Sequence, residues 1–238
     1  MGAVPSRICG EPRVGACEHG AMSQPLATTD RTKVRRLPDR GTSDRTTAYA
    51  VIDEAYLAHV GFVVDGEPRV LPMTYGREGD VLYLHGAVGN AMLRASIGAQ
   101  VCVTITLLDG LVLARSAFHH SMNYRSVVLL GEATKVEDDE VKRHAFDVIV
   151  EHVLTGRTQV ARPASDAELR KTLVLALPIE EGSAKVRTGG PIDDDEDMDL
   201  PVWAGIVPLR LTAGEPVQDT AQATALPVPV VGGTGRTR

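Results

Sequence analysis

The densest group of side chains that could do chemistry lies at residues 118–126, which read FHHSMNYRS. One apolar, β-branched stretch (101–114) precedes this run and another (127–136) follows it, which predicts core strands on both sides. A plain turn would favour Gly, Pro, Asn or Asp, and only Asn123 fits that description. Because polar side chains this dense at the end of a sheet more often contact a ligand than close a hairpin, we place the candidate binding site here.

A metal site is the first interpretation of the two histidines. His119 and His120 are adjacent, so on a strand their side chains point to opposite faces and cannot jointly chelate one ion. His85 could join one of them, but no carboxylate or cysteine lies near in sequence to complete the set. The acidic run 193–197 lacks the spacing of a calcium loop and is expected to be solvated. We therefore predict no metal site.

Nucleophilic catalysis is the second interpretation. Ser116, Ser121 and Ser126 have histidines close by, but the chain has no Gly-x-Ser-x-Gly motif. Sequence order leaves a catalytic triad unsupported without excluding it. The chain also lacks a phosphate-binding P-loop and a dinucleotide-binding Gly-x-Gly-x-x-Gly motif between a strand and a helix.

A site for a planar, anionic cofactor remains. Arg115 and Arg125 could hold a phosphate group, because guanidinium N–H groups match phosphate oxygens in geometry. Hydrogen bonds to a polar heterocycle or to a ribityl chain are available from Ser116, Ser121, Asn123 and Ser126.

The composition sets limits on partners and location. The 238 residues carry a net charge of −6 and only 4% aromatic residues, which disfavours nucleic-acid binding. The three cysteines, Cys9, Cys17 and Cys102, show neither a disulfide framework nor zinc spacing, as expected for a reducing, cytoplasmic setting. No apolar run approaches the ~20 residues that a membrane-spanning helix needs. We expect no nucleic-acid partner and no membrane association.

Hydrophobic periodicity predicts a mainly β (α+β) domain. The expected strands are 57–64 (buried on both faces), 69–75, 81–85, 99–108, 111–116, 127–136, 174–179 and 183–187. The expected helices are 45–56 (capped by Asp44), 91–97, 139–154 and 167–173. Asp109-Gly110 signals a hairpin, and 201–211, with Trp203, a final packed segment. Closely spaced strands with short turns favour a barrel, since closure removes exposed edges.

The predicted domain occupies residues 33–211, between a disordered leader (1–32) and a disordered tail (212–238), because both ends lack periodicity. The basic cluster 33–36 is interpreted as a solvated arm or as an arm that reaches a phosphate or a partner subunit.

Three stretches resemble one known family. They are 58–66 (AHVGFVVDG), 70–76 (VLPMTYG) and 82–86 (LYLHG), and they are similar to the pyridoxamine 5′-phosphate oxidase-like flavoproteins. Within that family the chain resembles the flavin-nucleotide-binding branch that includes nitroimidazole-resistance-type reductases. The resemblance runs from about 33 to 211 and is most specific at 118–127 and 177–187. It implies a split β-barrel with short flanking helices, and a homodimer with FMN at the subunit interface.

The resemblance also implies cofactor-binding roles. The strand with Pro72, Thr74 and Tyr75 and the turn His85-Gly86 would line the flavin. The flavin ring, ribityl chain or phosphate would contact Ser121, Asn123, Tyr124, Arg125 and Ser126, while Arg187 and Trp203 would approach from the partner subunit. Many relatives carry a lysine after the His85 strand that helps bind phosphate. This chain has Gly89-Asn90-Ala91 there, so Arg94 or Arg125 would substitute.

The implied activity is that of an FMN-dependent oxidoreductase acting on a small-molecule substrate, with a reduced nicotinamide or a deazaflavin as electron donor. No catalytic residue is assigned, although His85, His119 or Tyr124 could donate a proton. The alternative is a non-catalytic flavin- or haem-binding module for storage, sensing or haem handling, because fold and cofactor do not fix a reaction. Pyridoxamine phosphate oxidation itself is disfavoured, because the substrate-binding arginine and histidine pattern of that oxidase near the C-terminus is not evident here.

Overall fold

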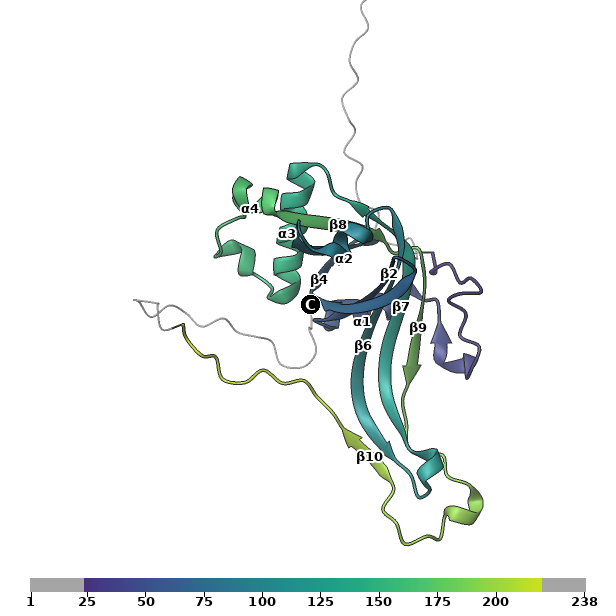
Figure 1. Cartoon of the computed structure of the whole chain (residues 1–238). Coiled ribbons are helices and arrows are strands. Elements are labelled where there is room, and N and C mark those ends of the chain that lie inside the picture. The colour runs from purple at the N-terminus through teal and green to yellow at the C-terminus, as the bar shows by residue number, and fades with distance from the viewer. Residues whose placement is uncertain (1–23, 220–238) are drawn as a thin grey trace, which may run out of the picture.

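The computed structural model describes residues 24–219 and consists of one strongly curved sheet with helices at its ends (Figure 1). The strands are β1 (Gly41–Thr42), β2 (Ala58–Val64), β3 (Glu67–Met73), β4 (Tyr75–Glu78), β5 (Val81–Ala87), β6 (Ala99–Leu113), β7 (Ser121–Lys135), β8 (Thr172–Pro178), β9 (Glu181–Arg187) and β10 (Gly205–Pro208). The helices are α1 (Arg45–Glu54), α2 (Ala91–Ala95), α3 (Asp139–Val153) and α4 (Asp166–Lys171), with short 3-10 turns η1 (Pro38–Arg40), η2 (Ala117–His119), η3 (Arg157–Gln159) and η4 (Asp195–Asp197). The predicted mainly β class with short helices is confirmed.

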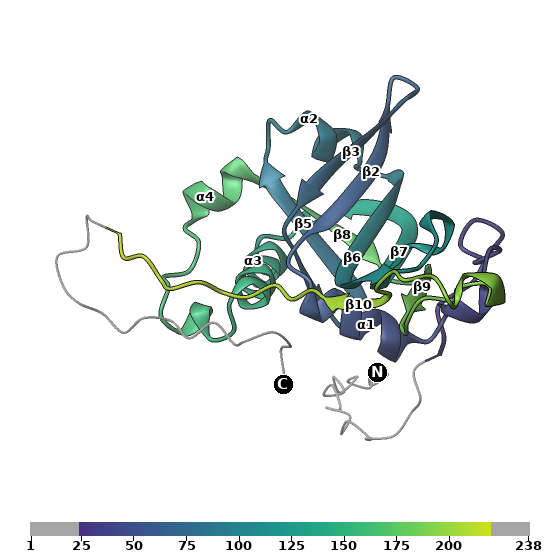
Figure 2. The same ribbon diagram turned by 90° about the horizontal axis from the view of Figure 1, so that it is seen from below.

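The sheet order is β3–β2–β6–β7–β8–β5–β4, with β9 paired to β7 and to β1, and β10 paired to β6. All these strand pairs are antiparallel. β7 is long enough to pair with β6 along most of its length and, on its other edge, with β9 and then β8. The curvature of the sheet therefore encloses a core between strands that are distant in sequence (Figure 2).

Alternation of side chains along β6 and β7 builds that core. Val103 lies opposite Leu129 and Ile105 opposite Val127, and all four side chains are fully buried. The intervening residues of both strands point to the other face, where they are partly or fully exposed. One face of the β6–β7 pair is thus packed and the other is open to ligands or partners.

The hairpin predicted at Asp109-Gly110 is wrong. β6 continues through both residues, and the register against β7 shifts between Leu108 and Gly110, as in a β-bulge. A Cβ at Gly110 would lie 3.1 Å from the backbone oxygen of Val207, so glycine allows the close approach of β10 here and does not mark a turn. The turn between β6 and β7 lies instead at residues 114–120.

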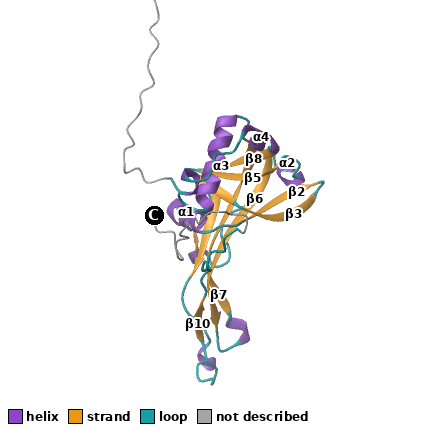
Figure 3. Cartoon of the chain, turned by 90° about the vertical axis from the view of Figure 1, so that its left-hand side faces the viewer, coloured by secondary structure: helices purple, strands orange, loops and turns teal. Residues whose placement is uncertain are grey.

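The ends of β6 and β7 form a projection that we call the arm, residues 107–125. Figures 1 and 3 show the arm leaving the barrel as a long two-stranded ribbon, with β10 alongside it. The backbone oxygen of Asp109 accepts a hydrogen bond from the backbone N–H of Leu209 (3.0 Å), so the contact between the arm and this segment continues one residue past the end of β10. The motif 118–126 therefore lies at the tip and on one strand of the arm, away from the barrel core.

Other expectations need correction. β2 alternates between buried and exposed residues, so it is not buried on both faces, and Val70 on the neighbouring strand β3 is 62% exposed. The segment 201–211 contributes strand β10, but Trp203 is 64% exposed, so the segment is not packed into this chain. Leu26 is buried, and Ala27 donates to the oxygen of Glu180 (2.8 Å), so the fold begins before residue 33.

The helices match the prediction closely. Asp44 caps α1 and Asp138 caps α3 through side-chain hydrogen bonds to backbone N–H groups. Ala145, Ile149 and His152 form the buried face of α3, whereas Val141, expected on that face, is 46% exposed. No helix within residues 24–219 is long and apolar enough to cross a membrane. The remainder of the expected leader and tail, 1–23 and 220–238, lies outside the described residues.

Candidate functional site

The two histidines of the motif hold the tip of the arm in shape. His119 Nε2 lies 3.1 Å from a carboxylate oxygen of Asp194, and His120 Nδ1 lies 2.9 Å from the oxygen of Ser116. Arg115 binds Asp193 through its backbone N–H and its guanidinium, each at 2.9 Å. The Asp193 side chain is only 1% exposed, so the acidic run is not entirely solvated as predicted. Among residues 24–219 no group of metal ligands forms.

Arg125 is occupied by two carboxylates. Its Nε and Nη2 bind Asp109 at 3.0 and 2.7 Å, and its Nη2 also binds Glu54 at 2.9 Å. Hydrogen bonds first to Glu54 and then to Asp109 raise the already high pKa of Arg125. One guanidinium beside two carboxylates leaves a net negative charge, which would repel a phosphate. The structure therefore gives Arg125 a bridging contact between the arm and the end of α1.

Arg187 is in the opposite situation. It is 5% exposed, and its guanidinium donates to Asn123 Oδ1, to the oxygen of Gly189 (3.1 Å) and to that of Gly190 (3.0 Å). Its Nε is buried and has no hydrogen-bond partner among residues 24–219. Burial first, and then the nearby charge of Arg40, lowers the pKa of Arg187. Within the described part of the chain, Arg187 has no ion pair with a carboxylate.

A buried cation without an anion is costly unless a ligand supplies the charge. The neighbours of Arg187 offer neutral oxygens only, and Arg40 adds a second positive charge. Among the residues that the structure describes, the Asn123–Arg187 pair is therefore the most suitable position for the anionic group of a cofactor.

A polar row lies on the open face of the sheet, next to this pair in sequence, although Asn123 itself is on the same side of β7 as the buried Val127. Thr106, Ser126 and Lys185 are directly opposite one another across β6, β7 and β9, and such cross-strand neighbours share a face. In the next row Tyr124 lies opposite Arg187. The Ser126 hydroxyl donates to the oxygen of Lys185 at 3.3 Å. We call this set the arm site: Thr106, Asn123, Tyr124, Ser126, Lys185 and Arg187.

Sequence reasoning missed Thr106 and Lys185. Thr106 lies in an apolar strand outside any motif, and Lys185 lies within the resembling stretch 177–187 but was given no role. The signal that would have found them is the register of β7, because Ser126 pairs with both. Ser121 was predicted and lies at the tip of the arm, opposite Val112.

Tyr75 belongs to the core. It is fully buried, and its hydroxyl donates to the oxygens of Ile52 (2.6 Å) and Ala55 (3.0 Å), while its ring lies 4.4 Å from that of His152. A side chain held in this way is not available to line a flavin. Its neighbour Thr74 is exposed between β3 and β4.

The turn His85-Gly86 packs against helices. The centroid of the His85 ring lies 5.7 Å from that of Phe146 on α3, and burial lowers the pKa of His85. Its Nδ1 is buried and has no hydrogen-bond partner in the described part of the chain. A Cβ at Gly86 would lie 2.7 Å from a methyl carbon of Leu93, so the turn packs closely against α2.

The remaining predicted residues lie apart from the arm. Pro72 is exposed on β3, opposite His59, and Arg94 is exposed on α2. Neither β3 nor β5 pairs with arm residues. Trp203 is next to β10, with its ring 3.0 Å from a Cβ built on Gly205. The structure thus joins Asn123, Tyr124, Ser126 and Arg187, and separates them from the set on β3–β5 and α2.

These observations describe a barrel whose sheet has one solvent-exposed face with polar side chains, which suits the binding of a cofactor. The chain belongs to the pyridoxamine 5′-phosphate oxidase family, whose model matches residues 44–186, and the predicted split-barrel fold and flavin-binding family are confirmed. No curated protein sequence matches the chain.

Several solved structures are similar to this chain, and three of them are described by a cofactor or a resistance role. The flavocytochrome Anf3 from Azotobacter vinelandii is 40% identical, with 86% of this chain and 96% of that chain covered and a TM-score of 0.81. The FAD and haem binding protein from Mycobacterium smegmatis is 38% identical over 80% and 94% of the two chains, with a TM-score of 0.77. A third structure, from Bacteroides thetaiotaomicron, is described as a 5-nitroimidazole antibiotic resistance protein. It is 31% identical, with 61% of this chain and 86% of that chain covered and a TM-score of 0.51.

Proposed function

We propose that this protein is a flavin-dependent oxidoreductase that works as a homodimer in the cytoplasm. The observation that carries the proposal is the 40% identity, over 86% of the chain, to a protein described as a flavocytochrome. Membership of a flavin-binding family and the cationic arm site support it. The cytoplasmic location rests on the cysteine pattern alone.

The arm site fits the anionic end of a flavin nucleotide. Arg187 supplies a buried positive charge, and Asn123 accepts a hydrogen bond from its guanidinium, which orients that group. Ser126 and Thr106 add hydroxyl groups, and Lys185 adds a second cation. The flavin, when bound, supplies the hydride or electron transfer chemistry, and the protein orients it and excludes water.

Apolar exposure along the arm supports a second copy of this chain as partner. Phe118 is 88% exposed, Trp203 64% and Met122 50%, and all three lie on or beside the arm. Large apolar side chains gathered on one projection are typical of protein–protein contacts. Burial of the arm against the partner would also exclude water from the arm site, as a cofactor site requires.

The sequence predicts FMN, whereas the Mycobacterium smegmatis protein is named for FAD and haem. The test is to release the cofactor from the purified protein by acid and to identify it by chromatography and mass spectrometry. FMN or FAD, together with bleaching of the visible flavin absorption by a reduced nicotinamide or a reduced deazaflavin, supports the proposal. A bound flavin that no donor reduces would indicate a non-catalytic binding module and would overturn the proposed oxidoreductase activity.

The second candidate is a protein that holds haem together with flavin. Both of the more similar structures are described in those terms, one as a flavocytochrome and one as an FAD and haem binding protein. Absorption spectra distinguish the two, because haem adds a Soret band that flavin lacks. A pyridine haemochrome assay that finds no haem after expression with added haem precursor would remove this candidate and leave the first untouched.

A further inference from the structure

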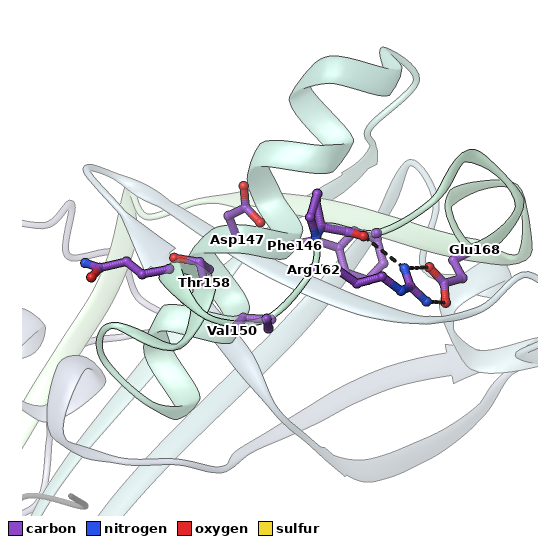
Figure 4. Close-up of a pocket in the computed structure, with 10 residues that line it drawn as sticks. Phe146, Asp147, Val150, Thr158, Arg162 and Glu168 are labelled. Carbon is purple, nitrogen blue, oxygen red and sulfur yellow. Dashed lines mark hydrogen bonds and ion pairs between the residues drawn. The ribbon is translucent and has the colours of Figure 1, made fainter. Parts of the chain in front are cut away.

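A cavity of about 600 Å³ lies between α3, η3 and α4, apart from the arm site (Figure 4). Its volume is in the range of small-molecule sites. We call it the α3–α4 cavity, and it is lined by Phe146, Asp147, Val150, Thr158, Gln159, Ala161, Arg162, Pro163, Ala164 and Glu168. None of the residues predicted to bind the cofactor lines it.

The walls of this cavity are held in place. Glu151 accepts hydrogen bonds from the backbone N–H groups of Gly156 (2.6 Å) and Thr158 (2.8 Å), which fixes the η3 side. Arg143 binds Asp166 at 3.0 Å and also donates to the oxygen of Ala164, which fixes the α4 side. The concavity is thus preformed, so a ligand would lose little free energy in ordering it.

Charge decides which ligands fit. Arg162 forms a two-pronged ion pair with Glu168, at 2.8 and 2.7 Å, and this pair closes one end of the cavity (Figure 4). Hydrogen bonds first from Arg162 and then from Ser165 hold the pKa of Glu168 far below its usual range, so the pair stays ionised and neutral overall. Asp147, toward the opposite end in Figure 4, has no hydrogen bond or ion pair within residues 24–219. One uncompensated negative charge therefore remains.

The apolar part of the lining favours a flat ring. Phe146 and Val150 lie one turn apart on α3, and Pro163 and two alanines face them from the loop. Phe146 is partly buried against the core and contacts His85, and the part of its ring that lines the cavity can contact an aromatic ring or a cation. Flavin and haem both carry anionic groups, which the free carboxylate of Asp147 would repel.

We propose that the α3–α4 cavity binds a planar organic cation, that is, a flat aromatic ligand with a protonated nitrogen. Phe146 contacts the ring, and Asp147 compensates the charge. The site is independent of the flavin, so it stands whether or not the proposed activity is confirmed. Since Phe146 also contacts His85 on β5, a ligand here would lie one side chain away from that strand.

The test is a fluorescence titration of the purified, cofactor-containing protein with proflavine, a planar aminoacridine cation. We expect one saturable site. Asp147→Asn should weaken it about tenfold, whereas Asp139→Asn, on the same helix but outside the cavity, should change the affinity less than twofold. The control matters because the chain carries a net charge of −6, which attracts any cation weakly.

A cavity-filling variant provides the second arm. Ala161→Phe should abolish saturable binding while the thermal midpoint stays within a few degrees of that of the unsubstituted protein. The anionic probe 8-anilinonaphthalene-1-sulfonate should bind no more tightly than proflavine. Absence of a saturable site, equal effects of the two aspartate substitutions, or full binding by Ala161→Phe would each overturn the proposal.

Discussion

The buried guanidinium of Arg187 donates a hydrogen bond to the side-chain oxygen of Asn123, which ties the end of β9 to the base of the arm on β7. Both residues are at least nine-tenths buried, and no carboxylate within the described residues compensates the charge. We propose that in this pyridoxamine 5′-phosphate oxidase-like barrel the pair binds the anionic group of the flavin.

Arg187→Gln should weaken flavin binding tenfold or more, because the substitution removes the buried charge that the cofactor compensates; one tenfold step is ~1.4 kcal/mol. Fluorescence titration of the cofactor-free protein measures the affinity. Arg187→Lys keeps the charge but loses the two-pronged geometry of the guanidinium, so its flavin affinity should lie between those of the unsubstituted protein and Arg187→Gln. The exposed Arg157→Gln is the matched control, and an equal loss of affinity in that variant would show that only the overall charge matters.

Arg125→Ala should act mainly on stability. Its removal leaves Glu54 and Asp109 facing each other without a cation, which should lower the free energy of unfolding by about 1–3 kcal/mol at these half-buried positions. Urea unfolding monitored by circular dichroism measures this change. Flavin affinity should stay within about threefold. A large loss of flavin affinity at unchanged stability would show that Arg125 binds the phosphate, and it would contradict the proposed role of the arm site.

Arg125 and Arg187 show which features of the site the sequence predicts and which it does not. The polar window that contains Asn123 and Arg125 was found from composition, and the mainly β fold and the caps Asp44 and Asp138 from periodicity and local chemistry. The partner of Arg125, Glu54, lies 71 residues away on a helix, so no local pattern shows that the guanidinium is already occupied.

Tertiary contacts also overrode two local signals. Asp109-Gly110 is a strong hairpin sequence, yet β10 pairs across it and the glycine serves a bulge. Tyr75 lies in a stretch that resembles a flavin-binding strand, but the chain buries it under α1 and α3. Which side of a strand faces a ligand depends on register, and register depends on strands distant in sequence.

Phe118→Ser and Trp203→Ser should each weaken the dimer at least tenfold, because both side chains are largely exposed in one chain and would be buried in two. Sedimentation velocity over a dilution series measures the dissociation constant. Val160→Ser is the control, since Val160 is 75% exposed but lies between α3 and α4. A monomer at all concentrations, with flavin bound, would contradict the proposed assembly.

His85 should make stability depend on pH. Burial lowers its pKa, so the folded chain holds it neutral while the unfolded chain protonates it near the ordinary value of about 6.5. The unfolded state then binds more protons as pH falls below that value, and stability declines. Urea unfolding at about pH 7.5 and about pH 5.5 should show a smaller decline for His85→Asn than for the unsubstituted protein. Identical declines would assign the effect to other groups.

Flavin-dependent redox chemistry is decided by the absorption spectrum of the protein purified from its expression host, before and after addition of a reduced nicotinamide or a reduced deazaflavin. We expect the two visible bands of an oxidised flavin and their loss on reduction. A colourless protein that takes up neither FMN nor FAD would contradict this expectation.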